Sequence, residues 1–243
     1  MSGIIEIAAA VGVFLVGILV RALLAVLMIL LFAIPVVLVV AAIRGWQELR
    51  ARSLGLVPAG GLHYKPGLLY AANHTWLARD PGRMLRVGLD DLAQRLFPGV
   101  TSIRLVAPGT TVREGDPLAE ISCGDKKASI GSPADAVVVD QNDAVLSDPS
   151  LVHRDPYRAG WLLRLQPVNR RYALAARRGK IAQGWLSEES FRLTGFLERE
   201  LGIAAADGGE VLVPSAALLR ADQWKALTQT FLNGGANEPR AAA

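Results

Sequence analysis

Residues 87–96 read VGLDDLAQRL, and they join two kinds of local sequence. Residues 85–88 are one of several short runs typical of β-strands, whereas residues 90–96 are the one short helical stretch among those runs. The other strand candidates are separated by turn residues and lie at 68–70, 102–106, 118–122, 128–130, 136–139 and 161–165. Many short strands at close spacing predict a small β-sandwich or barrel.

Further motifs flank residues 87–96 in a fixed order. His74-Thr75-Trp76 precedes them, and the turn Glu114-Gly115 follows. A closing group comprises Asn142, DPSLV at 148–152, DPY at 155–157 and GWL at 160–162. Together these motifs resemble the glycine-cleavage H protein, whose typical members read Val-Gly-Ile-Thr-x-x-Ala-Gln-x-x-Leu where this chain reads VGLDDLAQRL. The resemblance covers residues 68–167.

The resemblance implies the hammerhead β-sandwich of biotinyl and lipoyl domains. The expected fold class is therefore an N-terminal transmembrane α-helix, a mainly-β lipoyl/biotinyl-type sandwich and C-terminal helices. The motif residues identify a fold rather than a chemistry. His74 and Trp76 are expected to be packing residues, and Asp155-Pro156-Tyr157 is typical of a turn.

The resemblance also implies a carrier position, because in that family a lysine on a tight hairpin turn is joined to lipoate through an amide. Counting forward from Gly115 and back from Pro133 places this position at Asp125. Gly124-Asp125 suits a plain tight turn. We therefore expect no lipoyl group and no other cofactor.

Lys126 and Lys127 keep an alternative open, namely a covalent lipoate one or two residues beyond the family position. A shift of one residue on a hairpin turns a side chain to the other face, so Lys126 is expected to point differently from a carrier arm. Lys127 returns to the same face, away from the apex. Cys123, beside the turn, is a candidate redox thiol, although a lone cysteine in a strand is more often a small packing residue.

The N-terminal segment is apolar, and only Glu6 and Arg21 carry charge between residues 3 and 43. A membrane span needs about 20 apolar residues. Residues 22–43 meet this requirement without a charge and form the expected span of an anchor at residues 1–46. Residues 3–20 form a further helix, either amphipathic or buried in a complex, or else a second span of a hairpin. The lack of turn residues near Arg21 favours a single span with a further N-terminal helix over a hairpin of two spans.

Three arginines, Arg44, Arg50 and Arg52, follow the span. By the positive-inside rule they place the soluble domain in the cytoplasm, at the bacterial inner membrane. A second basic cluster comprises Arg170, Arg171, Arg177, Arg178 and Lys180. With the net charge of +4, these clusters make membrane lipid an expected partner. Nucleic acid is not expected, because the basic residues are not interleaved with aromatic ones.

Beyond the sandwich the sequence is less informative. Residues 47–67 are expected to be a linker, since Pro58, Gly60 and Gly61 break any periodicity. Residues 168–233 are expected to be a helical extension with helices at 181–201 and 216–232, followed by a disordered tail at 234–243. These helices either pack on the sandwich or present a docking surface for a partner subunit, with the candidate residues Trp185, Phe191, Phe196 and Trp224.

No catalytic pattern stands out, because the chain lacks a nucleophile elbow, a phosphate loop and paired carboxylates at a motif spacing. The single cysteine and three scattered histidines predict neither an intrachain disulfide nor a metal site. We expect a non-enzymatic accessory subunit of a membrane complex, for example in respiratory or photosynthetic electron transfer. The alternatives are a membrane-tethered lipoyl carrier and a membrane sensor whose sandwich binds a small ligand in an apolar pocket.

Overall fold

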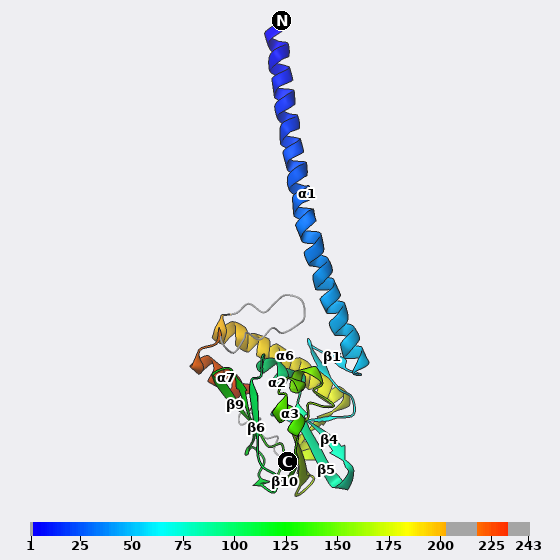
Figure 1. The fold of residues 1–243 in the computed structure, drawn as a ribbon, viewed down its shortest axis with the longest axis vertical. Coiled ribbons are helices and arrows are strands. Elements are labelled where there is room, and N and C mark those ends of the chain that lie inside the picture. The colour runs from blue at the N-terminus through cyan, green and yellow to red at the C-terminus, as the bar shows by residue number, and fades with distance from the viewer. Residues whose placement is uncertain (1, 203–217, 233–243) are drawn as a thin grey trace. The chain divides into compact units, whose positions relative to one another are not determined.

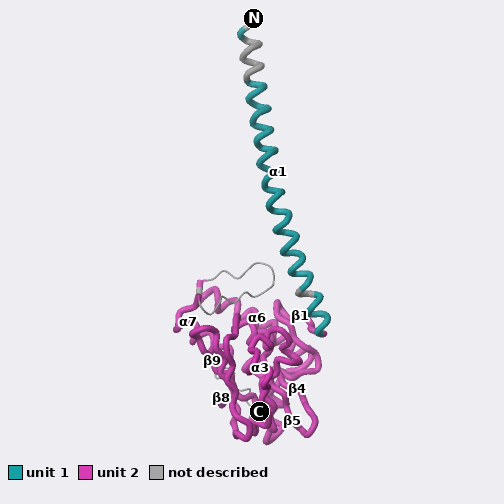
Figure 2. Tube along the Cα trace, viewed as in Figure 1, with its two compact units in different colours: residues 1–54 teal, residues 55–243 magenta. Residues whose placement is uncertain are grey.

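The computed structural model describes residues 2–202 and 218–232, and the chain divides into two compact units, 1–54 and 55–243 (Figure 2). The first unit is a single helix, α1 (Ser2–Ser53). Its 52 residues give a length of about 78 Å at a rise of about 1.5 Å per residue, against about 30 Å for a bilayer core. The helix continues through Arg21 and Pro35, so residues 2–53 contain no hairpin turn.

The side chains of α1 explain why it can serve as an anchor. Large apolar residues are exposed on all sides of the helix from Val11 to Ile43. A helix that is apolar all round normally lies in a protein core or in a membrane. Residues Val11–Ser53 are long and apolar enough to cross a membrane, by length and composition alone. The expected span at 22–43 lies inside this segment.

The second unit is mainly β-structure, and every strand pairing in it is antiparallel (Figure 1). The largest sheet has the order β12 (Arg177–Arg178), β3 (Leu69–Tyr70), β4 (Thr75–Asp80), β5 (Met84–Leu89), β11 (Leu163–Pro167), β10 (Ala136–Gln141) and β7 (Thr111–Val112). A second sheet has the order β6 (Ser102–Leu105), β8 (Pro117–Cys123) and β9 (Lys126–Gly131), and a third pairs β1 (Val57–Ala59) with β2 (Leu62–Tyr64).

The helices of this unit are short except near the C-terminus. They are the 3-10 helix η1 (Pro81–Arg83), α2 (Asp91–Leu96), α3 (Asp143–Ser147), α4 (Leu151–Arg154), α5 (Arg171–Ala175), α6 (Gly179–Leu201) and α7 (Ala221–Leu232). The structure therefore confirms the expected fold class: a long apolar N-terminal helix, a mainly-β sandwich and C-terminal helices. The strand at 85–88 and the helix at 90–96 are also confirmed, as β5 and α2.

The register of β4 and β5 explains the glycine of the 87–96 motif. Trp76 lies opposite Gly88, and the indole is almost fully buried. A Cβ atom at Gly88 would lie 2.4 Å from Cζ2 of Trp76, far inside the contact distance of two carbon atoms. Only glycine therefore lets the buried indole occupy this place.

Hydrogen bonds of Asn142 explain why this residue is part of the closing motif. The Nδ2 atom of Asn142 donates to the backbone oxygens of Ala159 and Trp161, at 2.7 and 2.6 Å. Its Oδ1 atom accepts from the backbone N–H of Ala144 and caps α3. One buried amide thus satisfies three backbone groups and joins the end of β10 to the chain entering β11.

The structure corrects the expected linker at 47–67. Residues 47–53 continue α1, and residues 57–64 form the β1–β2 hairpin, in which Leu62 is fully buried. Gly60 and Gly61, whose φ angles are 59° and 87°, form its two-residue turn. In the sequence, such a glycine turn looks like an interruption of the regular pattern and therefore like a linker. In the structure, α6 holds the hairpin, because Gln183 Nε2 donates a hydrogen bond to the Pro58 oxygen at 2.8 Å.

The C-terminal region contains the expected helices, α6 and α7, and of the two alternatives they follow the one in which they pack on the sandwich. β12 pairs with β3 at the edge of the large sheet, and α6 and α7 bury apolar side chains in the common core. The expected tail at 234–243 and the start of the expected last helix, residues 216–217, lie outside the described residues.

Candidate functional site

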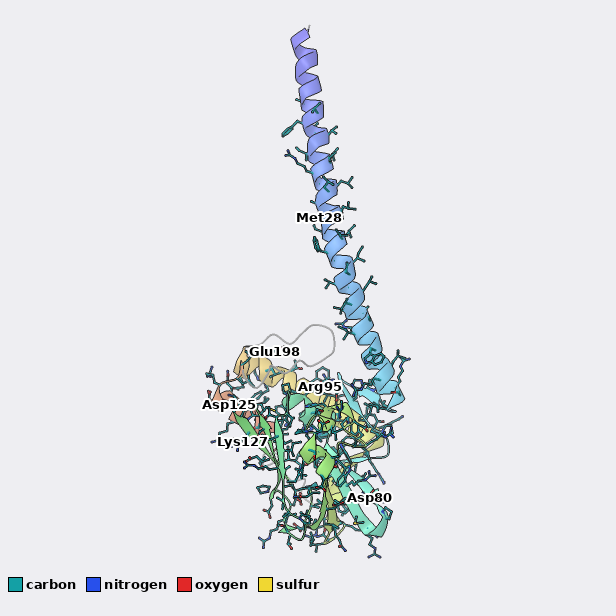
Figure 3. All side chains as sticks on the ribbon, viewed as in Figure 1. Met28, Asp80, Arg95, Asp125, Lys127 and Glu198 are labelled. Carbon is teal, nitrogen blue, oxygen red and sulfur yellow. The ribbon has the colours of Figure 1, made fainter. Side chains whose placement is uncertain are left out.

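The β8–β9 hairpin places Asp125 at its apex. Cys123 lies opposite Lys126, so Gly124 and Asp125 are the two residues of the turn. Gly124 has a φ of 63°, in the left-handed region that glycine enters without a steric penalty. The Asp125 side chain is 83% exposed and projects from the end of the hairpin (Figure 3). The residue at the implied carrier position is thus solvent-exposed and acidic.

The two neighbouring lysines face opposite sides of β9. Lys126 lies on the face of the buried Ala128, its side chain is only 12% exposed, and its Nζ lies 3.6 Å from Asp125 Oδ2. Lys127 is on the outer face, 52% exposed, with its Nζ 3.1 Å from Glu120 Oε1. Neither amine stands at the apex. The apex as built does not fit an amide-linked lipoyl group.

Cys123 is buried in the core cluster next to the turn. Burial raises the pKa of its thiol to about 11. Because the thiolate is the reactive form, a thiol that stays protonated at neutral pH is a poor nucleophile. The geometry favours the packing interpretation of Cys123 over the redox one.

Helix α7 covers the outer edge of this hairpin. β9 is an edge strand of its sheet, and the Nε1 atom of Trp224 donates to the Lys127 backbone oxygen at 2.8 Å. The indole also packs edge-on against Phe97, with ring centroids 6.0 Å apart. An edge strand exposes unpaired backbone groups, so this contact both satisfies one of them and fixes α7 beside the apex.

The four aromatic docking candidates do not form one surface. Trp185 and Trp224 are buried, and Phe196 is half-buried against Phe231 of α7, with centroids 5.8 Å apart. Only Phe191 is largely exposed. Of the two alternatives for these residues, packing on the sandwich holds for Trp185, Trp224 and Phe196, because α6 and α7 bury or half-bury these rings.

A buried charge cluster was missed by the sequence reasoning. His74 is fully buried; its Nδ1 lies 2.8 Å from Asp90 Oδ2, and its Nε2 lies 3.5 Å from Glu189 Oε2 on α6. Trp185 stacks on the imidazole, with ring centroids 4.9 Å apart. Asp90 also caps α2, since its Oδ1 accepts from the Ala93 N–H at 2.9 Å. The cluster joins the motif region to the C-terminal helices.

The electrostatics of this cluster favour a charged imidazole. Burial alone would lower the pKa of His74, but the negative charges of Asp90 and Glu189 and the hydrogen bond to Asp90 outweigh it and raise the pKa to about 9. A signal was present in the sequence, because Glu189 follows Trp185 by four residues and precedes Leu193 by four. An acidic residue on the apolar face of a helix needs a buried partner.

The remaining expected site residues are the three basic residues of the N-terminal unit. Arg44, Arg50 and Arg52 all belong to the last turns of α1. Across residues 2–202 and 218–232, no group of three or more His, Cys, Asp or Glu side chains could hold a metal ion.

Comparison with known proteins finds one family repeatedly. A model of the family described as glycine cleavage H-protein matches residues 68–182. The glycine cleavage system H protein of Mycobacterium tuberculosis (strain ATCC 25618 / H37Rv) is 34% identical over 99 residues, which cover 41% of this chain and 74% of that protein. The mitochondrial H protein of Pisum sativum is 26% identical over 141 residues, or 53% of this chain and 85% of that protein.

A solved structure is also similar. It is a glycine cleavage system H protein from Mycobacterium marinum, with 28% identity and a TM-score of 0.39, covering 46% of this chain and 87% of that chain. The matched segment spans a smaller share of some relatives, for example 60% of the glycine cleavage system H protein 2 of Aquifex aeolicus (strain VF5).

Proposed function

The chain belongs to the glycine cleavage H-protein family, and from this premise we propose that it is a non-lipoylated, non-catalytic member of that family. It serves as an accessory subunit of a membrane protein complex, anchored by α1, with the sandwich on the cytoplasmic side. Its partners are membrane lipid and the other subunits of that complex. It carries no cofactor of its own.

One observation carries this proposal: the apex of the hairpin holds Asp125, and no amine stands there. A carrier arm needs an exposed amine at the turn. Of the two lysines nearby, Lys126 has a largely buried side chain, and Lys127 pairs with Glu120. The bond from Trp224 to the Lys127 oxygen supports the same conclusion, because α7 occupies space beside the turn that a modifying enzyme would have to approach.

The test is to purify the chain from its native membranes in mild detergent and to measure the mass of the peptide that contains residues 125–127. An unmodified peptide, together with other membrane subunits in fixed stoichiometry, is the expected result. The variant Asp125→Lys, expressed in the same host, is the matched control, because it restores an exposed amine at the apex and reports whether that host can lipoylate this turn.

A lipoyl mass on the wild-type peptide would overturn the proposal. A chain that elutes alone and free of lipoate would overturn the subunit role. The conclusion that the protein is not a lipoyl carrier would then still stand.

The orientation has a separate test. Thr110 is exposed in the loop before β7 and accepts a cysteine without disturbing the core. The variant Thr110→Cys in intact cells should react with a membrane-impermeant thiol reagent only after lysis. Labelling of intact cells would place the sandwich outside the cytoplasm.

A second candidate function is a membrane-tethered lipoyl carrier modified on Lys127. The observation that favours it is the half-exposed ammonium of Lys127 on the outer face of β9, two residues beyond Asp125. In that case the lipoyl mass should disappear in Lys127→Arg and persist in Lys126→Arg.

A further inference from the structure

The connection from β11 to β12 exposes apolar and basic side chains together. We call residues 168–181 the basic ridge. It contains five Lys or Arg residues and no acidic residue. Three of its large apolar side chains are exposed to solvent: Val168, Leu174, which is 89% exposed, and Ile181. Exposed leucine and isoleucine side chains among basic residues match the composition of segments that bind at a membrane interface.

A hollow adjoins the start of the ridge. It has a volume of about 260 Å³ and lies between the β4–β5 turn and the chain that leaves β11. The basic side chains in its wall are Arg79, Arg83 and Arg170, and Val168 and Met84 add apolar surface. We call it the arginine hollow. Asp80 also lines the hollow. Figure 3 labels Asp80 and Asp125, which lie well apart on the 55–243 unit.

The arginine hollow is positive despite the carboxylate in its wall. Asp80 is neutralised from two sides, by Arg86 at 2.9 Å and by Arg164 at 3.4 Å. Within residues 2–202 and 218–232, no ion pair joins Arg79, Arg83 or Arg170 to an acidic side chain. Guanidinium groups bind phosphate oxygens through paired N–H donors, so three of them around one hollow favour a phosphate-bearing anion.

We propose that the arginine hollow and the basic ridge form a second contact with the membrane, in which the arginines bind the phosphate groups of anionic lipids and Leu174 enters the interface. The exposed apolar side chains favour a lipid surface over free phosphate as the ligand, because free phosphate offers no apolar partner for Val168, Leu174 or Ile181. The contact can be weak and still be occupied, since the α1 tether keeps the sandwich at a high effective concentration near the bilayer. This inference rests on the proposed membrane anchoring.

The test uses the full chain in nanodiscs of phosphatidylglycerol mixed with phosphatidylcholine, with a fluorophore on Leu174→Cys and nitroxide-bearing lipids as quenchers. The native Cys123 is buried and should take up little label, which the unsubstituted chain checks. Thr110→Cys is the matched exposed site away from the ridge. Met28→Cys, within α1, reports whether the helix is in the bilayer.

We expect quenching at Leu174→Cys and not at Thr110→Cys. The triple variant Arg79→Gln/Arg83→Gln/Arg170→Gln should lower the ratio of docked to undocked protein by roughly a hundredfold, because each basic side chain at an anionic surface contributes about 1 kcal/mol. The triple variant Arg104→Gln/Arg113→Gln/Arg158→Gln, which loses the same charge elsewhere, should dock like the unsubstituted chain. Discs of phosphatidylcholine alone should also abolish most of the quenching.

The outcomes separate this inference from the proposed function. Quenching at Met28→Cys without quenching at Leu174→Cys would overturn the second contact and leave the anchor intact; an acidic protein partner would then be the better occupant. No quenching at Met28→Cys would contradict the anchor itself. Equal quenching at Leu174→Cys in both lipid compositions, unchanged in the arginine variant, would overturn recognition of the phosphate groups.

Discussion

The corner where β4, β5 and α2 meet and the apex of the β8–β9 hairpin both lie in the segment that matches the family, yet they differ in what holds their residues in place. At the corner, Gly88 makes room for Trp76, and Asp90 caps α2 while it pairs with His74. At the apex, Asp125 projects into solvent, and its Oδ2 lies 3.6 Å from Nζ of the adjacent Lys126.

The two regions therefore differ in how strongly the fold constrains their residues. A residue at the corner cannot change without a steric clash or an unpaired buried charge. A residue at the apex contributes little to folding, so the side chain there can be replaced at little cost to the stability of the sandwich. The corner residues are therefore tied to the fold, whereas the apex residue is free to vary.

The largest expected effect comes from a matched pair of aspartates. Asp90→Ala should lower the free energy of unfolding by about 3–5 kcal/mol, because it leaves the buried His74 without its closest counter-charge and removes the cap of α2. Asp125→Ala should change it by less than about 0.5 kcal/mol. Denaturant unfolding of the full chain in detergent measures both, and similar losses for the two variants would contradict the comparison.

The pH dependence of stability should reveal the corner as well. A His74 pKa raised to about 9 means that its contribution is complete below the unfolded value of 6.5 and is lost as pH rises through about 9. The free energy of unfolding should fall by roughly 3 kcal/mol over this window. The Cys123 thiol adds a loss only at higher pH, because its unfolded pKa is already 9.0.

Glu189→Gln should reduce this fall, since it removes one of the two carboxylates that raise the pKa of His74, whereas Asp125→Asn should leave it unchanged. A stability profile that is flat between about pH 6.5 and about pH 9 would mean that His74 is neutral in the folded protein.

Two glycines give a smaller contrast. Gly88→Ala should cost about 2–3 kcal/mol, because its Cβ would overlap the Trp76 ring. Gly124→Ala should cost only about 1 kcal/mol, from the positive φ, because no atom lies within 4 Å of a Cβ there. Thermal or denaturant unfolding separates them. If the clash is the cause, Gly88→Ala combined with Trp76→Leu should destabilise by less than the sum of the two single changes.

The smallest expected loss of stability comes from the contact between α7 and the β8–β9 hairpin. Trp224→Phe keeps an aromatic ring but loses the hydrogen bond to the Lys127 oxygen, so it should cost about 1 kcal/mol. It should also speed backbone hydrogen exchange along β9. Phe191→Leu, on the exposed face of α6, is the control and should affect neither measurement. Unchanged exchange in Trp224→Phe would mean that α7 does not hold the hairpin.

Local sequence patterns predicted much of the fold because local interactions make it. The run at 85–88, the helix at 90–96 and the turn at 124–125 depend on neighbours a few residues away, and the structure confirms each of them. The β1–β2 hairpin did not follow from the sequence, since its glycine turn resembles a linker. Its stability comes from α6, more than a hundred residues later in the chain.

The amino-acid sequence was enough to predict the long apolar helix, the family and an acidic residue in the turn at 124–125, because each is a matter of residue type and order. The roles of Trp185, Trp224 and Glu189 became apparent only from the packing of the folded chain. A helical period shows that side chains share a face, but what covers that face depends on distant segments. The pairing of His74 with Glu189 and the arginine hollow both arise from such long-range packing, which no local pattern encodes.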